Sequence, residues 1–287
     1  MKQLLILSGK GGTGKTTVAG AFIKLSKADA YADCDVDAPN LHLAVSNGNL
    51  RDKSDFYGLP KASINPEKCT SCGICFDNCR FDAIKTTNGY SVDTYSCEGC
   101  GVCAALCPAG AISMDACIAG DLMLYGELAV FSTARLRMGS GNSGLLVTEV
   151  RNRLSKAAPG APYAIIDGSP GIGCPVIASL TGVDMVLIVA EPSLSGISDM
   201  QRVIETAKIF MIETVVCINK YDINIRNTEK IESLCKDAGI PVSGRIPYDE
   251  KVIHAVNNGM SIVELDCPAG DAIRTVFEKT MEIFQPI

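Results

Sequence analysis

The cysteines of this chain are concentrated in one short segment. Eight of the 14 lie between positions 69 and 107, in two runs with the spacing C-x2-C-x2-C-x3-C, and the second run follows the first by 28 residues. Thiolates are soft ligands that suit both zinc and iron–sulfur clusters, and clustered cysteines in a chain where no secretory signal is recognised indicate metal or redox centres rather than disulfides. The spacing therefore predicts thiolate metal sites. The runs are Cys69, Cys72, Cys75 and Cys79, then Cys97, Cys100, Cys103 and Cys107.

A second chemical pattern lies near the N-terminus. Residues 9–16 read G-K-G-G-T-G-K-T, which satisfies G-x4-G-K-[ST] directly after an apolar run and before an amphipathic stretch. Glycines let backbone N–H groups approach phosphate oxygens, and the following helix adds the positive end of its dipole. The motif predicts a phosphate-binding loop in which Lys15 reaches the β- and γ-phosphates and Thr16 holds Mg²⁺. The expected loop contacts are Gly11, Gly12, Thr13, Gly14, Lys15, Thr16 and Thr17.

The loop also contains an early lysine, Lys10. With it, the motif resembles the deviant Walker A motif of the MinD/Mrp/ParA class of P-loop ATPases, which includes the nitrogenase iron protein. This resemblance covers nearly the whole chain. It implies Mg²⁺ and ATP as ligands, and slow or partner-stimulated hydrolysis. It also implies ATP-dependent dimerisation in which Lys10 reaches the partner's nucleotide, either in a homodimer or in a heterodimer with a paralogue.

The same resemblance assigns roles to residues at the ends of apolar runs. The segment D-C-D is similar to switch I, so Asp35 is expected to orient the attacking water and Asp33 to support the Mg²⁺ site. The segment D-G-S-P-G resembles Walker B with switch II, which places Asp167 beside the metal. Asn219 and Pro247 resemble adenine contacts. The sequence N-K-Y-D at Asn219 alone would also fit a guanine motif, and only the class resemblance favours ATP.

The cysteine runs resemble those of bacterial two-cluster ferredoxins, in which the fourth cysteine of each run ligates the other cluster. The resemblance implies one [4Fe–4S] cluster on the first three cysteines of the first run plus Cys107, and another on Cys97, Cys100, Cys103 and Cys79. A pair of zinc sites remains the main alternative, because thiolates suit both metals. Arg80 stands where the first run would ordinarily have proline.

Cys174 is a further thiol of interest. It lies seven residues after Asp167, at the offset of a cluster ligand in the nitrogenase iron protein. That protein's second ligand would fall near residues 139–144, where this chain has no cysteine. A functional thiol and an ordinary packed thiol both remain open for Cys174.

Apolar runs and amphipathic stretches alternate along most of the chain, which predicts an α/β fold with a doubly wound, mostly parallel sheet. Between residues 62 and 116 this alternation stops. We therefore expect a P-loop ATPase domain in two parts, 1–61 and 117–287, with an inserted α+β ferredoxin-like domain at 62–116. Strands are expected at 4–7, 128–131, 163–167, 184–190 and 214–219, and helices at 15–27, 143–154, 198–210, 228–238, 249–257 and 271–284.

Charge and hydropathy exclude several classes of function. The formal net charge of -6 provides no field that would attract nucleic acid. No apolar run approaches the roughly 20 residues that span a bilayer, and the C-terminal stretch has few cations for membrane docking. A cytoplasmic protein without a stable membrane anchor is expected.

Together these patterns predict an ATPase whose nucleotide-dependent dimerisation is coupled to two [4Fe–4S] clusters. It would serve electron transfer to a metalloprotein partner, or maturation of that partner. An iron–sulfur cluster carrier similar to Mrp is the first alternative, although the C-terminal half has no C-x-x-C for a labile cluster. A MinD-like spatial regulator with a redox-sensing insert is the second, and the missing basic amphipathic tail counts against it.

Overall fold

The structure is a computed structural model that describes residues 1–45, 48–126 and 129–285. Its centre is a nine-stranded sheet in which neighbouring strands are parallel, except where β8 pairs with β9 and β3. The predicted doubly wound, mostly parallel α/β sheet is confirmed. In spatial order the strands are β13 (Val242–Ile246), β12 (Glu213–Asn219), β11 (Met185–Ala190), β1 (Lys2–Leu7), β10 (Tyr163–Asp167), β2 (Ala30–Asp33), β9 (Val130–Leu136), β8 (Ile118–Tyr125) and β3 (Leu50–Tyr57).

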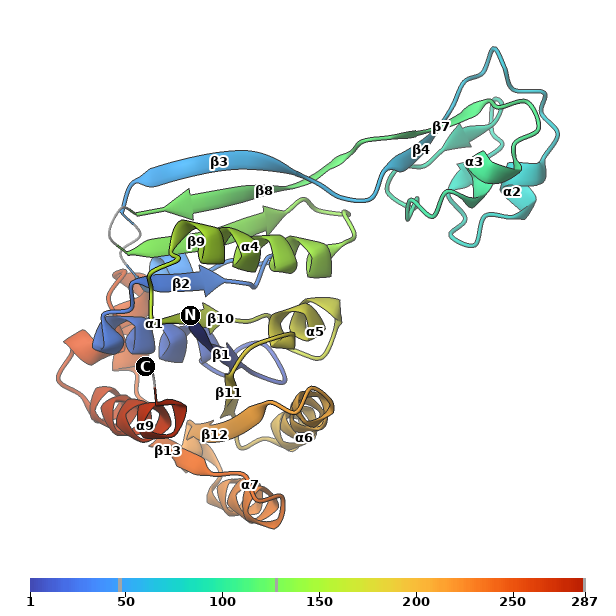
Figure 1. Ribbon diagram of the computed structural model, residues 1–287. Helices are drawn as coiled ribbons and strands as arrows, with labels where there is room; N and C mark the ends of the chain where they lie inside the picture. The colour runs from blue at the N-terminus through green and yellow to red at the C-terminus, as the bar shows by residue number, and fades with distance from the viewer. Residues whose placement is uncertain (46–47, 127–128, 286–287) are drawn as a thin grey trace.

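Helices cover both faces of this sheet, so the central strands are buried on each side (Figure 1). In β1, Leu4 to Leu7 have no exposed surface, which explains why the run is continuously apolar rather than alternating. One face is covered by α4 (Ser143–Ala157), α5 (Cys174–Leu180), α6 (Leu194–Ile209) and α7 (Ile225–Asp237), and the other by α1 (Lys15–Ser26), α8 (Lys251–Asn257) and α9 (Pro268–Phe284). No helix in the described part of the chain has the length and apolarity needed to cross a bilayer.

The helix boundaries differ from the prediction mainly where another residue than the expected one caps the helix N-terminus. Helix α6 begins four residues early because the Ser193 side chain accepts a hydrogen bond from the Gly196 N–H. Helix α7 begins three residues early because Asn224 caps it by accepting from the Asn227 N–H. Helices α8 and α9 begin at 251 and 268 rather than at 249 and 271. Residue 128 of the strand predicted at 128–131 lies outside the described residues, and β9 continues to 136.

Two antiparallel strands at the sheet edge were not predicted. Strand β3 has the sequence L-R-D-K-S-D-F-Y, in which only Phe56 is buried. Such a strand lacks the apolar run or clean alternation that identifies strands in a sequence. It forms because β8 supplies hydrogen-bonding partners along its full length, from Leu50 opposite Tyr125 to Tyr57 opposite Ile118.

Residues 61–115 form a small unit, here called the cysteine module, that projects from the ends of β3 and β8 (Figure 1). Its buried apolar residues are few and mostly small: Ala62, Ala83, Ile84, Cys97 and Ala111. Gly73 and Gly101, 28 residues apart, adopt left-handed conformations with φ of 82° and 76° before the two short helices. The elements are β4 (Lys61–Ile64), α2 (Ile74–Asp77), β5 (Ile84–Lys85), β6 (Ser91–Val92), α3 (Val102–Leu106) and β7 (Ile112–Asp115), with β4 paired to β7 and β5 to β6.

Arg151 ties α4 to α5 and β1. Its guanidinium donates to the carbonyls of Ala178 and Thr181 and to Oε1 of Gln3. We expect Arg151→Ala to lower the free energy of unfolding by about 2–4 kcal/mol, because charged hydrogen bonds are lost and carbonyls are left without a donor. Urea denaturation of the nucleotide-free protein measures this. Arg226 is exposed, and Arg226→Ala should change the free energy of unfolding by less than about 0.5 kcal/mol. Equal effects of the two variants would contradict a stabilising role for the Arg151 hydrogen bonds.

Candidate functional site

The glycine-rich loop between β1 and α1 has the open backbone that phosphate binding requires. Gly12 and Gly14 have φ of 80° and 90°, in the region that side chains other than glycine disfavour. A Cβ at Gly14 would clash with the side-chain amide of Asn219. The Thr13 hydroxyl is buried and has no hydrogen-bond partner within the described residues. Loop amides and this hydroxyl can therefore bind an anion placed over the start of α1.

An open cavity of about 660 Å³ lies over this loop. Among the sequence-predicted nucleotide-site residues, 11–17, Asp35 and Asn219 line it. Four others are absent from its described lining: Lys10, Asp33, Asp167 and Pro247. Val252 and Ile253 of α8 also line it and were missed, because apolar residues on a short amphipathic helix read as core. Further lining comes from Ser8, Asp37, Ala38, Asn40, Ser169, Pro170, Pro175 and Lys220.

Lys15 lies at the centre of the site and forms an ion pair with Asp167. Lys15 Nζ is 2.5 Å from Asp167 Oδ1, and the two residues are only 6% and 0% exposed. Burial by itself lowers the pKa of Lys15, but the charge and hydrogen bond of Asp167 more than offset it, so the pKa is raised. Asp167 Oδ2 is buried without a partner within the described residues. An orphaned carboxylate oxygen near the Thr16 hydroxyl fits a Mg²⁺ ion, which prefers oxygen ligands.

Asp33 and Asp35 have different surroundings. Asp33 Oδ1 accepts from the Asp35 N–H at 3.0 Å, and Oδ2 accepts from the Leu41 N–H at 2.9 Å. Burial and the nearby charge of Asp167 raise the pKa of Asp33 to about 7. Burial also raises the pKa of Asp35, which lines the cavity. Asp33 therefore holds the segment after β2 in place, and Asp35 faces the space where a nucleotide would lie.

Lys10 points away from this cavity. Its Nζ donates to Ser193 Oγ at 2.9 Å and lies 3.6 Å from Glu191 Oε1. Glu191 also pairs with Lys220 at 3.7 Å, and Lys220 Nζ donates to the Gly12 carbonyl at 3.0 Å. This arrangement could not be predicted, because one glutamate after an apolar strand carries no specific signal.

Asn219 contacts the phosphate loop directly. Its Nδ2 donates to the Thr13 carbonyl at 2.7 Å, and its Oδ1 accepts from the Lys220 N–H. The residue predicted as a base contact therefore braces the loop in this structure. Pro247, the other predicted base contact, follows β13 at the start of the connection to α8.

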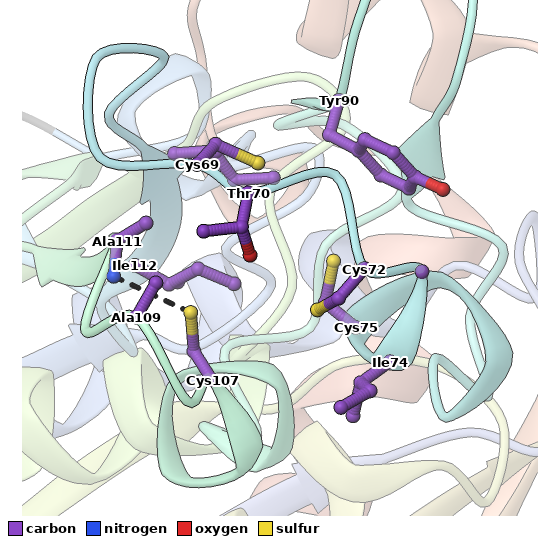
Figure 2. Close-up of a pocket in the computed structure, with 12 residues that line it drawn as sticks. Cys69, Thr70, Cys72, Ile74, Cys75, Tyr90, Cys107, Ala109, Ala111 and Ile112 are labelled. Atoms are coloured by element: carbon purple, nitrogen blue, oxygen red, sulfur yellow. Dashed lines mark hydrogen bonds between the residues drawn. The ribbon is translucent and has the colours of Figure 1, made fainter.

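The eight clustered cysteines border two separate cavities. One is lined by Cys69, Cys72, Cys75 and Cys107 (Figure 2). The other is lined by Cys79, Cys97, Cys100 and Cys103. In the first, the Ala111 N–H donates to Cys107 Sγ at 3.3 Å. We call these cavities the first and the second cysteine cavity.

The thiols of each cavity surround a space rather than a point. Within the described residues, no three His, Cys, Asp or Glu side chains converge closely enough to hold a single metal ion. None of the cysteines in the described chain forms a disulfide. Each set of four thiols therefore presents separated sulfur ligands around a cavity.

Cys174 is exposed at the start of α5. It belongs to neither cysteine cavity. It packs against the start of α4, where a Cβ on Gly144 would lie 3.3 Å from the Cys174 carbonyl oxygen. The thiol therefore sits where two helix N-termini meet.

The parallel sheet, the glycine-rich loop and the paired Lys15 and Asp167 define a P-loop nucleotide-binding protein. A family model described as CobQ/CobB/MinD/ParA nucleotide binding domain matches residues 4–262. The chain belongs to this family, as the sequence resemblance predicted.

Relatives and solved structures extend the comparison. An uncharacterised protein of Methanocaldococcus jannaschii is 30% identical over 98% of this chain and 96% of its own length. A protein of the same organism named iron-sulfur cluster carrier protein is 24% identical over 98% of this chain and 84% of its own length. The septum site-determining protein MinD of Pyrococcus horikoshii, solved with Mg-ADP, aligns with a TM-score of 0.59 and 17% identity over 98% and 96% of the two chains. That structural likeness concerns the fold.

Proposed function

We propose that this chain is an ATPase whose nucleotide-dependent dimerisation is coupled to two [4Fe–4S] clusters in an inserted ferredoxin-like domain, residues 62–116. It acts in the cytoplasm in electron transfer to a metalloprotein partner, or in that partner's maturation. The observation that carries the proposal is the division of eight cysteines into two sets of four, each around its own cavity, in a module joined to a P-loop sheet.

The cysteine spacing favours clusters over zinc. The run C-x2-C-x2-C-x3-C, present twice, is the one that two-cluster ferredoxins use, and each cavity brings the fourth cysteine of one run to the first three of the other. The module's buried apolar residues are too few and too small to stabilise it alone, so bound cofactors would contribute folding energy. The Ala111 N–H on Cys107 is the type of hydrogen bond that tunes a cluster ligand. Bound clusters would supply one-electron transfer.

The nucleotide site supports Mg²⁺-dependent ATP hydrolysis. Lys15 would exchange its ion pair with Asp167 for the phosphates, which frees the Asp167 carboxylate to face Mg²⁺ with Thr16. Asp35, in the cavity wall, would hold the attacking water in line. Lys10 would leave Glu191 and reach the nucleotide of a second subunit. Asn219, which lines the cavity, and Pro247 would contact adenine.

A cluster carrier is the second candidate. The names of relatives favour it, because proteins from Methanocaldococcus jannaschii and Pyrococcus horikoshii that align with nearly the whole chain are called iron-sulfur cluster carrier proteins. A carrier must release its cluster. Outside residues 69–107 this chain has no C-x-x-C for a labile site, and the four-cysteine cavities are suited to retention.

Anaerobic purification followed by an EPR redox titration, with and without Mg²⁺-ATP, tests the proposal. We expect two [4Fe–4S] signals and a nucleotide-dependent shift of at least about 60 mV, a tenfold change in a one-electron equilibrium. Incubation with an apo-ferredoxin tests the alternative. Retained clusters with a shifted potential support the electron-transfer role, whereas quantitative cluster transfer to the acceptor supports the carrier. Potentials and oligomeric state that do not respond to ATP would refute the coupling.

Asp35→Ala separates nucleotide binding from hydrolysis. We expect ATPase activity to fall about 100-fold, because the attacking water loses its orientation. ATP affinity should stay within about threefold, since Asp35 contributes no loop amide or cation to the phosphates. Steady-state phosphate release and calorimetric titration measure the two quantities. Asp29→Ala, which changes an exposed aspartate outside the lining of the nucleotide cavity, is the matched control and should retain activity. An equal loss of activity in both variants would contradict the role of Asp35.

A further inference from the structure

The cysteine module contacts the nucleotide-binding body through the loop before α4. A Cβ placed on Gly139 would lie 3.0 Å from Tyr95 Cδ1, and one on Gly141 would lie 3.1 Å from Glu98 Oε2. Tyr95 and Glu98 flank Cys97, the first cysteine of the second run. The loop of residues 138–142, here called the contact loop, therefore lies against the segment that opens the second cysteine cavity.

The other end of the contact loop reaches the wall of the nucleotide cavity. Asn142, with φ of 74°, is the N-cap of α4. Two residues on, a Cβ at Gly144 would lie 3.3 Å from the carbonyl oxygen of Cys174. Cys174 begins α5, and the next residue, Pro175, lines the nucleotide cavity. The packed contact between Cys174 and Gly144 therefore connects the segment that contains Pro175 to α4 and the contact loop.

The two cysteine cavities differ in their contacts with the contact loop and the neighbouring chain. The second lies beside the segment that joins the module to the sheet, because Lys61 Nζ at the start of β4 donates to the Cys97 carbonyl and Gly99 packs so closely on the Pro60 carbonyl that a Cβ would clash. In the first run, Gly73 faces Tyr90, which belongs to the module itself. Only the second cavity is joined to the contact loop by the contacts described.

We propose that the contact loop transmits the nucleotide state of residues 169–175 to the second cysteine cavity and leaves the first unaffected. A γ-phosphate can shift the conformation only through contacts that differ between the two states, and Ser169, Pro170 and Pro175 in the cavity wall are placed to make them. Arg151 fastens α4 to the end of α5, so a displacement of α5 is passed on to α4.

This inference rests on the proposed function only for the identity of the bound cofactor. Its test is hydrogen exchange of the full, anaerobically purified chain with and without a non-hydrolysable ATP analogue and Mg²⁺. We expect amide exchange in 137–142 and 93–101 to change about fivefold or more, the lower end for coupled sites. Exchange in 66–76, around the first run, should not change.

Tyr95→Ala is the informative variant. Tyr95 is 77% exposed and lies outside the lining of both cysteine cavities, so its removal should preserve the fold and the thiols. The response of 93–101 should disappear while that of 137–142 persists. Glu67→Ala is the matched control, because Glu67 occupies the equivalent position 28 residues earlier in the first run, and both responses should remain. Equal responses of the two runs, or none while the analogue binds, would overturn the inference.

EPR of the same samples distinguishes failure of the inference about the contact loop from failure of the proposed function. With two clusters bound, the analogue should shift the potential of one and not the other, and Tyr95→Ala should remove that shift. A chain without iron that still shows the exchange response would overturn the proposed function and support the inference. Two clusters bound with no exchange response would overturn the inference alone.

Discussion

Lys15→Ala should reduce ATP affinity by at least about a hundredfold and also destabilise the nucleotide-free protein. The first effect follows from removal of the cation that contacts the phosphates, since truncating one partner of a desolvated charge pair costs about 2–5 kcal/mol or more in binding. The second follows from the structure. Lys15 neutralises Asp167 at 2.5 Å, and its charge also interacts with Asp33 and Asp35.

Loss of Lys15 would leave these carboxylates facing one another in a buried site. Breaking a buried ion pair by removing one partner costs about 3–5 kcal/mol, which corresponds to a fall in melting temperature of about 5–8 °C for a chain of 287 residues. Calorimetric titration with Mg²⁺-ATP and a thermal scan measure the two effects.

Lys24→Ala is the matched control for this prediction. Lys24 lies on the same helix, α1, but it is exposed and pairs with Glu264 at the surface at 2.9 Å. Surface ion pairs contribute about 1 kcal/mol or less, so affinity should be unchanged and stability nearly so. If Lys15→Ala bound ATP within about threefold of the unmodified protein, the glycine-rich loop would not be the phosphate site.

Some residues of this site could be predicted from the sequence and others could not, because several of its contacts join strands that are far apart in the sequence. Strand ends at Asp33 and Asp167 were recognisable because each carboxylate follows a continuously apolar run, and parallel strands bring such ends together. The partners of Lys10 were not recognisable. Glu191 and Ser193 approach it only because β11 lies beside β1 in the sheet, and spatial order is not visible in one sequence.

The sheet edge shows a similar limit. Half of the residues of strand β3 are charged and only Phe56 is buried, so its conformation is set by pairing with β8 and not by its own pattern. The contact between Gly139 and Tyr95 could not be predicted for the same reason, because the two residues are 44 positions apart in the sequence. Local motifs identified the chemistry, and tertiary pairing determined how its parts are connected.

Cys107→Ser should remove the cofactor of the first cysteine cavity and spare that of the second. Cys107 belongs to the second run by sequence, yet it lines the first cavity with Cys69, Cys72 and Cys75. Serine keeps the shape of the side chain but lacks the soft thiolate that binds iron. We therefore expect iron content to fall from about eight to about four atoms per chain. Iron and sulfide analysis with EPR of the anaerobically purified variant measures this.

The two possible ligand arrangements predict different losses, which makes this substitution decisive. If each run served its own cluster, Cys107→Ser would disturb the signal that also depends on Cys97, Cys100 and Cys103. With the arrangement of the structure, Cys107→Ser and Cys72→Ser should remove the same EPR signal, and Cys79→Ser should remove the other. Cys117→Ser, outside both cavities, is the matched control and should retain all the iron. Loss of the second-cavity signal in Cys107→Ser would contradict the assignment, because that cavity is closed by Cys79.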